Sequence, residues 1–219
     1  MLFNETKGAD MVRGIAQIKL DERWELKDFA IFSKEYLQVY DFYYSLRLIG
    51  QDSEAKHIKS SLPWKGGHSV VHFFNGLSGK VGPLDKPIVK KIQYASPGVI
   101  ELQAVVQVAQ DVAIIVSSIS ASILSIATLY HRIRKDYLAR ELSRIEIQEA
   151  QQRLDHEDMR FIIESVKELQ QAFQLDSEQV RSLDLLSNGD QLVQLKMLMS
   201  LYRRAEPLAE LQVQNKAKF

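Results

Sequence analysis

The feature that most constrains this chain is a run without charged residues, 112–130, with the sequence VAIIVSSISASILSIATLY, followed at once by Arg132, Arg134 and Lys135. At about 1.5 Å per residue, a helix of this length approaches the roughly 30 Å hydrocarbon thickness of a bilayer. Such a run is typical either of a membrane-spanning helix or of a helix buried inside a protein assembly. The sequence on either side of the run indicates which of these two interpretations is favoured.

Apolar residues recur at alternating steps of three and four from Leu102 to Tyr137, through and beyond the charge-free run. This heptad spacing predicts one long helix, over residues 103–158, whose apolar seam pairs with a helix of the same chain or of a second copy. The central seam residues are Val112, Val116, Ile119, Ile123, Ile126, Tyr130 and Ile133. A row of small residues four apart permits a further helix to approach closely; it consists of Ala113, Ser117, Ala121 and Ser125.

The pattern of charges bears on whether the run crosses a membrane. Residues 96–111 contain no Lys or Arg, whereas basic residues follow the run. The positive-inside rule then places the C-terminal part in the cytoplasm and requires the folded N-terminal part to cross, although MLFNETKGAD has no secretory signal pattern. Five serines and a threonine also weaken insertion of the apolar segment. We therefore expect a cytoplasmic protein with a buried helix, and keep a membrane-anchored protein as the alternative.

Composition excludes several classes of function. The chain of 219 residues carries 28 basic and 28 acidic side chains, so it lacks the positive charge on which nucleic-acid binding normally depends. It contains no cysteine, which excludes disulfides, cysteine-based metal or cluster sites and thiol catalysis. Apolar residues make up 46% of the chain and charged residues 26%, values typical of a folded globular protein.

The first segment, residues 1–102, is predicted to be a small α+β domain of order β-α-α-β-β. Alternating apolar and polar residues predict a strand over 12–20, and aromatic residues at helical spacing predict a helix from Phe29 to about Gly50. A short helix is expected around residues 70–77. A hairpin is expected over residues 88–102, with Ser96, Pro97 and Gly98 in its turn. These elements describe a small sheet with helices on one face.

The last segment, residues 159–219, is predicted to form a helical hairpin or bundle. Apolar stripes resume at Ile162, Asp176 or Ser177 is expected to cap a helix, and a final Leu- and Met-rich helix is expected to be interrupted at Pro207. The fold class is therefore mainly α: an α+β unit, a long helix over 103–158 and a helical bundle or coiled-coil tail.

No stretch of the sequence carries a strong catalytic or ligand-binding motif. GLSGK over residues 76–80 fails as a phosphate-binding loop, because Phe74 replaces the first glycine and Val81 the magnesium-binding Ser or Thr. His68 and His72 share a helical spacing but have no third ligand near them in the sequence. We therefore predict no catalytic residue, no metal site and no cofactor.

The pattern favours a non-enzymatic interaction protein that self-associates through its long helix and uses the α+β domain to bind a partner or ligand. The alternative is a single-pass membrane-anchored sensor or effector that oligomerises through the same helix. An enzyme with scattered catalytic residues is the least favoured hypothesis. The expected partners are a second copy of the chain and a protein partner, with a membrane as the alternative and nucleic acid disfavoured.

Overall fold

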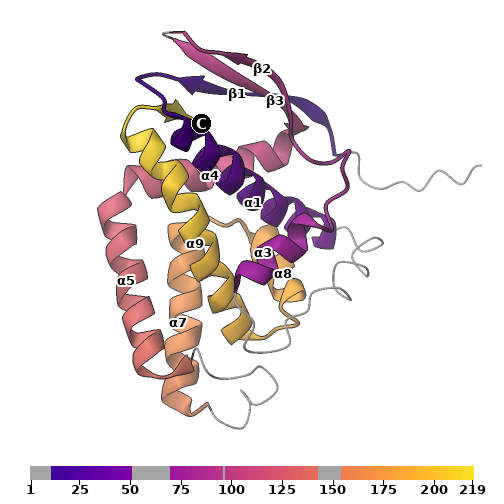
Figure 1. The fold of residues 1–219 in the computed structure, drawn as a ribbon. Helices are drawn as coiled ribbons and strands as arrows, with labels where there is room; N and C mark the ends of the chain where they lie inside the picture. The colour runs from indigo at the N-terminus through magenta and orange to yellow at the C-terminus, as the bar shows by residue number, and fades with distance from the viewer. Residues whose placement is uncertain (1–10, 51–69, 96, 143–153) are drawn as a thin grey trace, which may run out of the picture.

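The computed structural model describes residues 11–50, 70–95, 97–142 and 154–219. These residues form seven helices and four strands (Figure 1), which confirms a mainly helical protein with a small sheet. A single buried hydrophobic cluster takes residues from all three predicted segments, for example Tyr40, Val112 and Leu198. The boundaries at residues 102 and 158 stay a prediction.

The four strands form one antiparallel sheet of order β2-β3-β1-β4. The long strands are β1 (Arg13–Leu20) and β3 (Gly98–Val105), and they pair along their whole length. Strand β2 (Ile88–Gln93) lies at one edge, and the two-residue strand β4 (Ala217–Lys218) lies at the other. The sheet covers one side of the helices (Figure 1), and the face turned toward them buries Ile18, Leu20, Ile100, Leu102 and Ala104.

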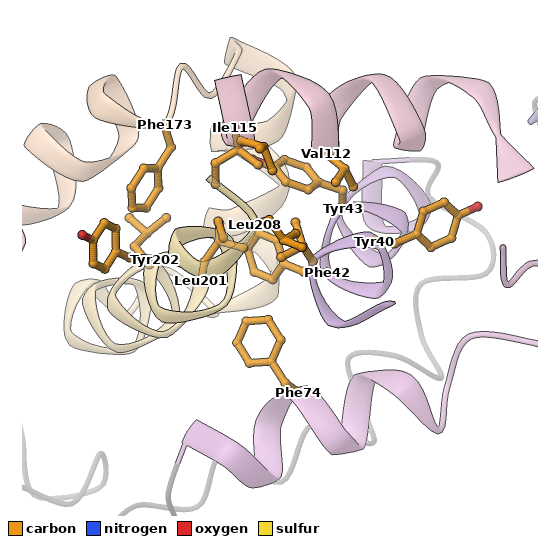
Figure 2. Packing of buried hydrophobic residues seen from close by; sticks show 14 of the residues in the cluster. Tyr40, Phe42, Tyr43, Phe74, Val112, Ile115, Phe173, Leu201, Tyr202 and Leu208 are labelled. Carbon is orange, nitrogen blue, oxygen red and sulfur yellow. The ribbon is translucent and has the colours of Figure 1, made fainter. Parts of the chain in front are cut away.

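Helix α9 (Gln191–Val213) is the centre of the helical part. It packs against α1 (Leu26–Gly50), α4 (Val106–Ala121) and α7 (His156–Ala172). Figure 2 shows Phe74, from α3 (Val70–Ser78), pointing toward Phe42 of α1, whose ring centroid lies 5.8 Å away. The predicted interruption at Pro207 is wrong, because α9 continues through this residue to Val213.

The single long helix predicted over residues 103–158 is not observed. Helix α4 ends at Ala121, and α5 (Ile123–Ala139) leaves it at an angle of 92°. Ser122, between them, has φ −134° and ψ 35°, which is outside the helical region. The bend lets α5 contact α7 and α9, so Ile126, Tyr130 and Ile133 are buried in the same core as α4. Residues 143–153 lie outside the described part.

Among the described helices, none is both long enough and apolar enough to cross a bilayer alone. Helices α4 and α5 reach the required length and hydropathy only when they are counted together, across their 92° bend. The straight apolar span that the sequence suggested over residues 112–130 is therefore replaced by two shorter helices.

Helix α8 (Ser177–Leu186) begins where the sequence predicted a cap. The Asp176 carboxylate accepts a hydrogen bond from the Gln179 backbone N–H at 2.8 Å, and the Gln179 side-chain oxygen accepts one from the Asp176 N–H at 3.0 Å. This reciprocal pair satisfies two backbone donors that a helix start leaves free. The capping prediction is confirmed for Asp176.

Candidate functional site

The predicted seam lies inside the chain. Val112, Val116, Ile119, Ile126, Tyr130 and Ile133 are each at most 6% exposed, and Ile123 is partly exposed. Helix α4 packs against α9 and α1, so the helix that pairs with this part of the seam belongs to the same chain. These side chains are therefore not available to a second copy in this fold.

The small-residue row lies largely at the surface. Ala113 and Ser117 are half-buried, whereas Ala121 and Ser125 are exposed. Three of these residues, with Gln174, line a shallow hollow beside α4. A row of small residues does not by itself define what binds there. Ala113 matters for a second reason, because it also lines the pocket described below.

Strand β1 has a free edge next to β4. Strand β4 pairs only with Lys19 and Leu20, so no strand of the described residues covers the β1 edge from 15 to 18. The Val12 carbonyl accepts from Val106 on the β3 side, and the Asp21 N–H donates to Lys216 on the β4 side. Because backbone direction alternates along an antiparallel strand, the N–H and C=O groups of Ile15 and Gln17 point toward the free edge.

An apolar pocket of about 250 Å³ lies directly beneath this edge, between β1 and α4. Four of its eleven lining residues are alanines, whose small side chains leave the space between β1 and α4 open. They come from both strands and from the helix: Ala16, Ala104, Ala109 and Ala113. Tyr36 and Phe219 also line the pocket, with ring centroids 6.4 Å apart. We call the free edge at residues 15–18 together with this pocket the β1 groove.

The β1 groove is largely apolar, and the polar residues of its lining include Gln17 and Gln110, which carry no charge. No charged side chain of the described residues lines the pocket. Ile15, which belongs to the lining, is 53% exposed, and the neighbouring Val12 is 58% exposed. Burial raises the pKa of Tyr36 above its ordinary value, so its hydroxyl stays neutral. The groove offers backbone hydrogen bonds and apolar contact, and it lacks the charged groups of acid–base chemistry.

A buried carboxyl group with a raised pKa lies outside the groove. Asp41 of α1 is fully buried, and neither carboxylate oxygen has a hydrogen-bond partner of good geometry among the described residues. Burial raises its pKa to about 6, while the nearby Ser78 hydroxyl and Lys86 ammonium partly oppose the shift. The Lys86 ammonium donates to the Ser78 hydroxyl over 3.2 Å. None of these three residues lines the β1 groove.

The predicted weak motifs do not assemble a site in the described part of the chain. His68 and the side chain of His72 lie outside the described residues. Among those that are described, no group of three or more His, Asp or Glu side chains is placed to share a metal ion. Sequence reasoning missed the β1 groove. The signal available for it was the spacing of four between Ala109 and Ala113, beside the strand alternation that puts Ala16 on the buried face.

Comparison with known proteins gives no relative: no family model, no curated protein and no solved structure matches this chain. The β1 groove offers two features to a ligand. One is an extended row of backbone groups without a strand partner among the described residues, and the other is a small apolar pocket beneath them. Both features match a polypeptide strand.

Proposed function

We propose that this chain is a non-enzymatic interaction protein whose β1 groove binds an extended segment of a partner protein. The segment adds to the sheet along residues 15–18 and places one large apolar side chain in the pocket beneath. Strand addition of this kind obtains affinity from backbone hydrogen bonds and specificity from side-chain pockets. The observation that carries the proposal is an apolar pocket lying directly under a strand edge that lacks a strand partner among the described residues.

Two further observations support an extended peptide over a small molecule. The pocket, at about 250 Å³, is smaller than the roughly 300–1,000 Å³ of typical small-molecule sites. Strand β4 already uses the same edge of β1 in antiparallel register, with Lys218 opposite Lys19. An incoming strand therefore continues an existing geometry. Exposed apolar rim residues such as Ile15 lose contact with water when it binds.

The self-association that the sequence predicted is not part of this proposal. Six of the seven named seam residues are buried against the rest of the same chain, which leaves little of the seam exposed for a second copy. A second copy could still reach the free edge of β1, so light scattering is needed alongside any binding assay. We commit to a partner protein as the occupant, because the pocket needs an apolar side chain presented on a strand with its own free edge.

The test uses a library of eight-residue peptides in which Thr alternates with Leu, Ile, Phe or Met. Binding is followed by amide chemical shifts of the full chain. We expect selected peptides to shift the signals of Ile15 and Gln17 and to leave those of Ile88 unchanged. The variant Ala113→Phe fills the pocket and should abolish binding. The control Ala139→Phe adds the same ring at an exposed position of α5, and it should bind as the wild type does.

A second variant separates backbone pairing from pocket filling. Gln17→Pro removes a backbone N–H that points to the free edge and leaves the β3 ladder intact, because proline is tolerated at strand edges. We expect it to weaken peptide binding while the protein stays folded. The proposal is wrong if no peptide of the library binds, or if binding persists in both Ala113→Phe and Gln17→Pro. A wild-type dimer that Ala113→Phe dissociates would also contradict it, because the occupant would then be a second copy.

A further inference from the structure

Residues 217–219, which we call the strap, lie along the β1 edge next to the β1 groove. Strand β4, the first part of the strap, pairs with β1 so that Lys218 lies opposite Lys19. Continuing this antiparallel register by one residue places Phe219 opposite Ile18, and both of these residues line the pocket of the groove. A partner strand that fills the β1 groove therefore needs a place that Phe219 already holds.

The Phe219 ring is the part of the strap that reaches under the sheet. It is half-buried, it is stacked on Tyr36 with ring centroids 6.4 Å apart, and its centroid lies 6.1 Å from that of Phe32. Tyr36 is also part of the pocket lining. An apolar side chain delivered into the pocket from an antiparallel strand is the arrangement proposed for the partner. The strap is therefore an intramolecular counterpart of the partner strand.

The strap is held less firmly than the residue before it. The Lys216 carbonyl accepts a hydrogen bond from the Trp24 indole N–H at 2.7 Å, and the Lys216 ammonium donates to the Asp28 carboxylate at 2.8 Å. Beyond Lys216, β4 pairs with only two residues of β1, and the Phe219 N–H donates to the Gln212 side-chain oxygen over 3.3 Å. The strap can thus leave β1 while Lys216 stays in place.

We propose that the strap competes with the partner strand for the β1 groove, and that the partner displaces it in order to pair with residues 15–20 of β1. This inference rests on the proposed function, because it concerns the same groove. The apparent affinity for a partner is then lowered by the fraction of molecules in which the strap is closed. Only a strand whose backbone pairing and apolar side chain outweigh those of the strap binds, so the strap sets a threshold for selection.

A reversible tether tests the displacement within one molecule. The chain contains no cysteine, so Lys19→Cys combined with Lys218→Cys allows a single disulfide within the chain, which thiol titration verifies. Both positions are exposed and directly opposite each other. Opposite residues of an antiparallel pair lie about 4.5–5.5 Å apart between Cα atoms, within the range that a disulfide spans. A library peptide that binds the wild type is titrated against the oxidised and the reduced form. Oxidation should weaken binding by about tenfold or more, because the strap can no longer leave.

The variant Phe219→Ala should produce the opposite change. It removes the ring with which the strap holds the pocket, so the affinity for the same peptide should rise by about tenfold. If the ring were a wall on which the peptide packs, this variant would weaken binding instead. The matched control, Phe161→Ala, removes a half-buried ring of α7 outside the groove and should change the affinity by less than about twofold.

The outcomes separate this inference from the proposed function. If the wild type binds the peptide but the oxidised and reduced forms bind it equally, the strap is no competitor, and the groove remains a peptide site. A loss of affinity in Phe219→Ala also overturns the inference and leaves the groove in place. If no peptide binds either the wild type or the reduced double variant, the groove is not a peptide site and both proposals are wrong.

Discussion

The two sides of helix α4 share one backbone but differ in packing: the side toward α9 and α1 is closed, and the side toward β1 is open. Toward α9 and α1, Val112, Ile115 and Val116 are completely buried, and no lining of a described pocket includes them. Toward β1, Ala109 and Ala113 leave a pocket of about 250 Å³ open under a strand edge. The two sides therefore differ in side-chain volume, with large side chains on the packed side and alanines beside the open space. Protein interiors are normally close-packed, and the space on the open side is the basis of the proposed peptide site.

The largest expected effect comes from making the closed side resemble the open one. Ile115→Ala removes a fully buried side chain and should lower the free energy of unfolding by about 3 kcal/mol, within the usual range for such truncations. Chemical denaturation monitored by circular dichroism measures this change. A loss below about 1 kcal/mol would show that this side of α4 is not packed as described.

The buried carboxyl of Asp41 gives the next largest effect, and it depends on pH. Its pKa rises from 3.8 in the unfolded chain to about 6 in the fold, so the native state binds the proton more tightly. The free energy of unfolding should therefore fall as pH rises through this interval. Asp41→Asn removes the titration, and it should gain about 2 kcal/mol over the wild type between pH 3.5 and pH 7.

Denaturation curves of both proteins across this pH range provide the measurement for Asp41. The two proteins should differ least at low pH, where the wild-type carboxyl is protonated. A constant difference between them at all pH values would contradict a raised pKa for this group. The comparison with Ile115→Ala then shows which costs more stability: the loss of core packing, or the buried Asp41 carboxylate, which has no hydrogen-bond partner of good geometry among the described residues.

Filling the open side should have a smaller effect on stability and a large effect on binding. Ala113→Leu places its added carbons in existing space, so the free energy of unfolding should change by less than about 1 kcal/mol. The peptides selected in the library screen should lose affinity for this variant. Thermal unfolding and peptide titration of the same sample measure the two effects. A loss above about 3 kcal/mol would mean that the space is not open in solution.

The smallest effect is expected at the bend between the two helices. Ser122 has a non-helical conformation, and its side chain caps neither α4 nor α5. Ser122→Ala favours a continuous helix by intrinsic propensity, by about 0.5 kcal/mol. This is far less than the burial of Tyr130 and Ile133 on α5 contributes. We therefore expect unchanged circular dichroism and a stability change within about 0.5 kcal/mol.

The bend also shows why the sequence predicted the wrong helix. The apolar positions of the heptad pattern lie in the core, because Val112, Ile119, Ile126 and Ile133 are all buried. The same spacing is compatible with one straight helix or with two helices that bury the same stripe against one core. Nothing local marks the break strongly, since Ser122 lies among other serines. The position of α9 selects the bent arrangement, and α9 comes about 70 residues later in the chain.

The sequence predicted the individual helices and strands better than it predicted their arrangement. Alternation located β1 within one residue of its observed start at Arg13, and the cap at Asp176 was confirmed. The β1 groove could not be predicted from the sequence, because it depends on β4 pairing with only two residues of β1. The length of β4 depends on where the end of α9 places the last residues relative to the sheet. Likewise, the contact between α5 and α9 depends on the bend between α4 and α5.

Hydrogen exchange at the β1 edge tests the central claim most directly. In the free protein, the amides of Ala16 and Ile18, which face β3, should exchange slowly, and those of Ile15 and Gln17 should exchange rapidly. Adding a selected library peptide should slow exchange at Ile15 and Gln17 and leave β2 unchanged. Slow exchange at Ile15 and Gln17 in the free protein, or protection that appears only on β2, would contradict a strand-binding groove at this edge.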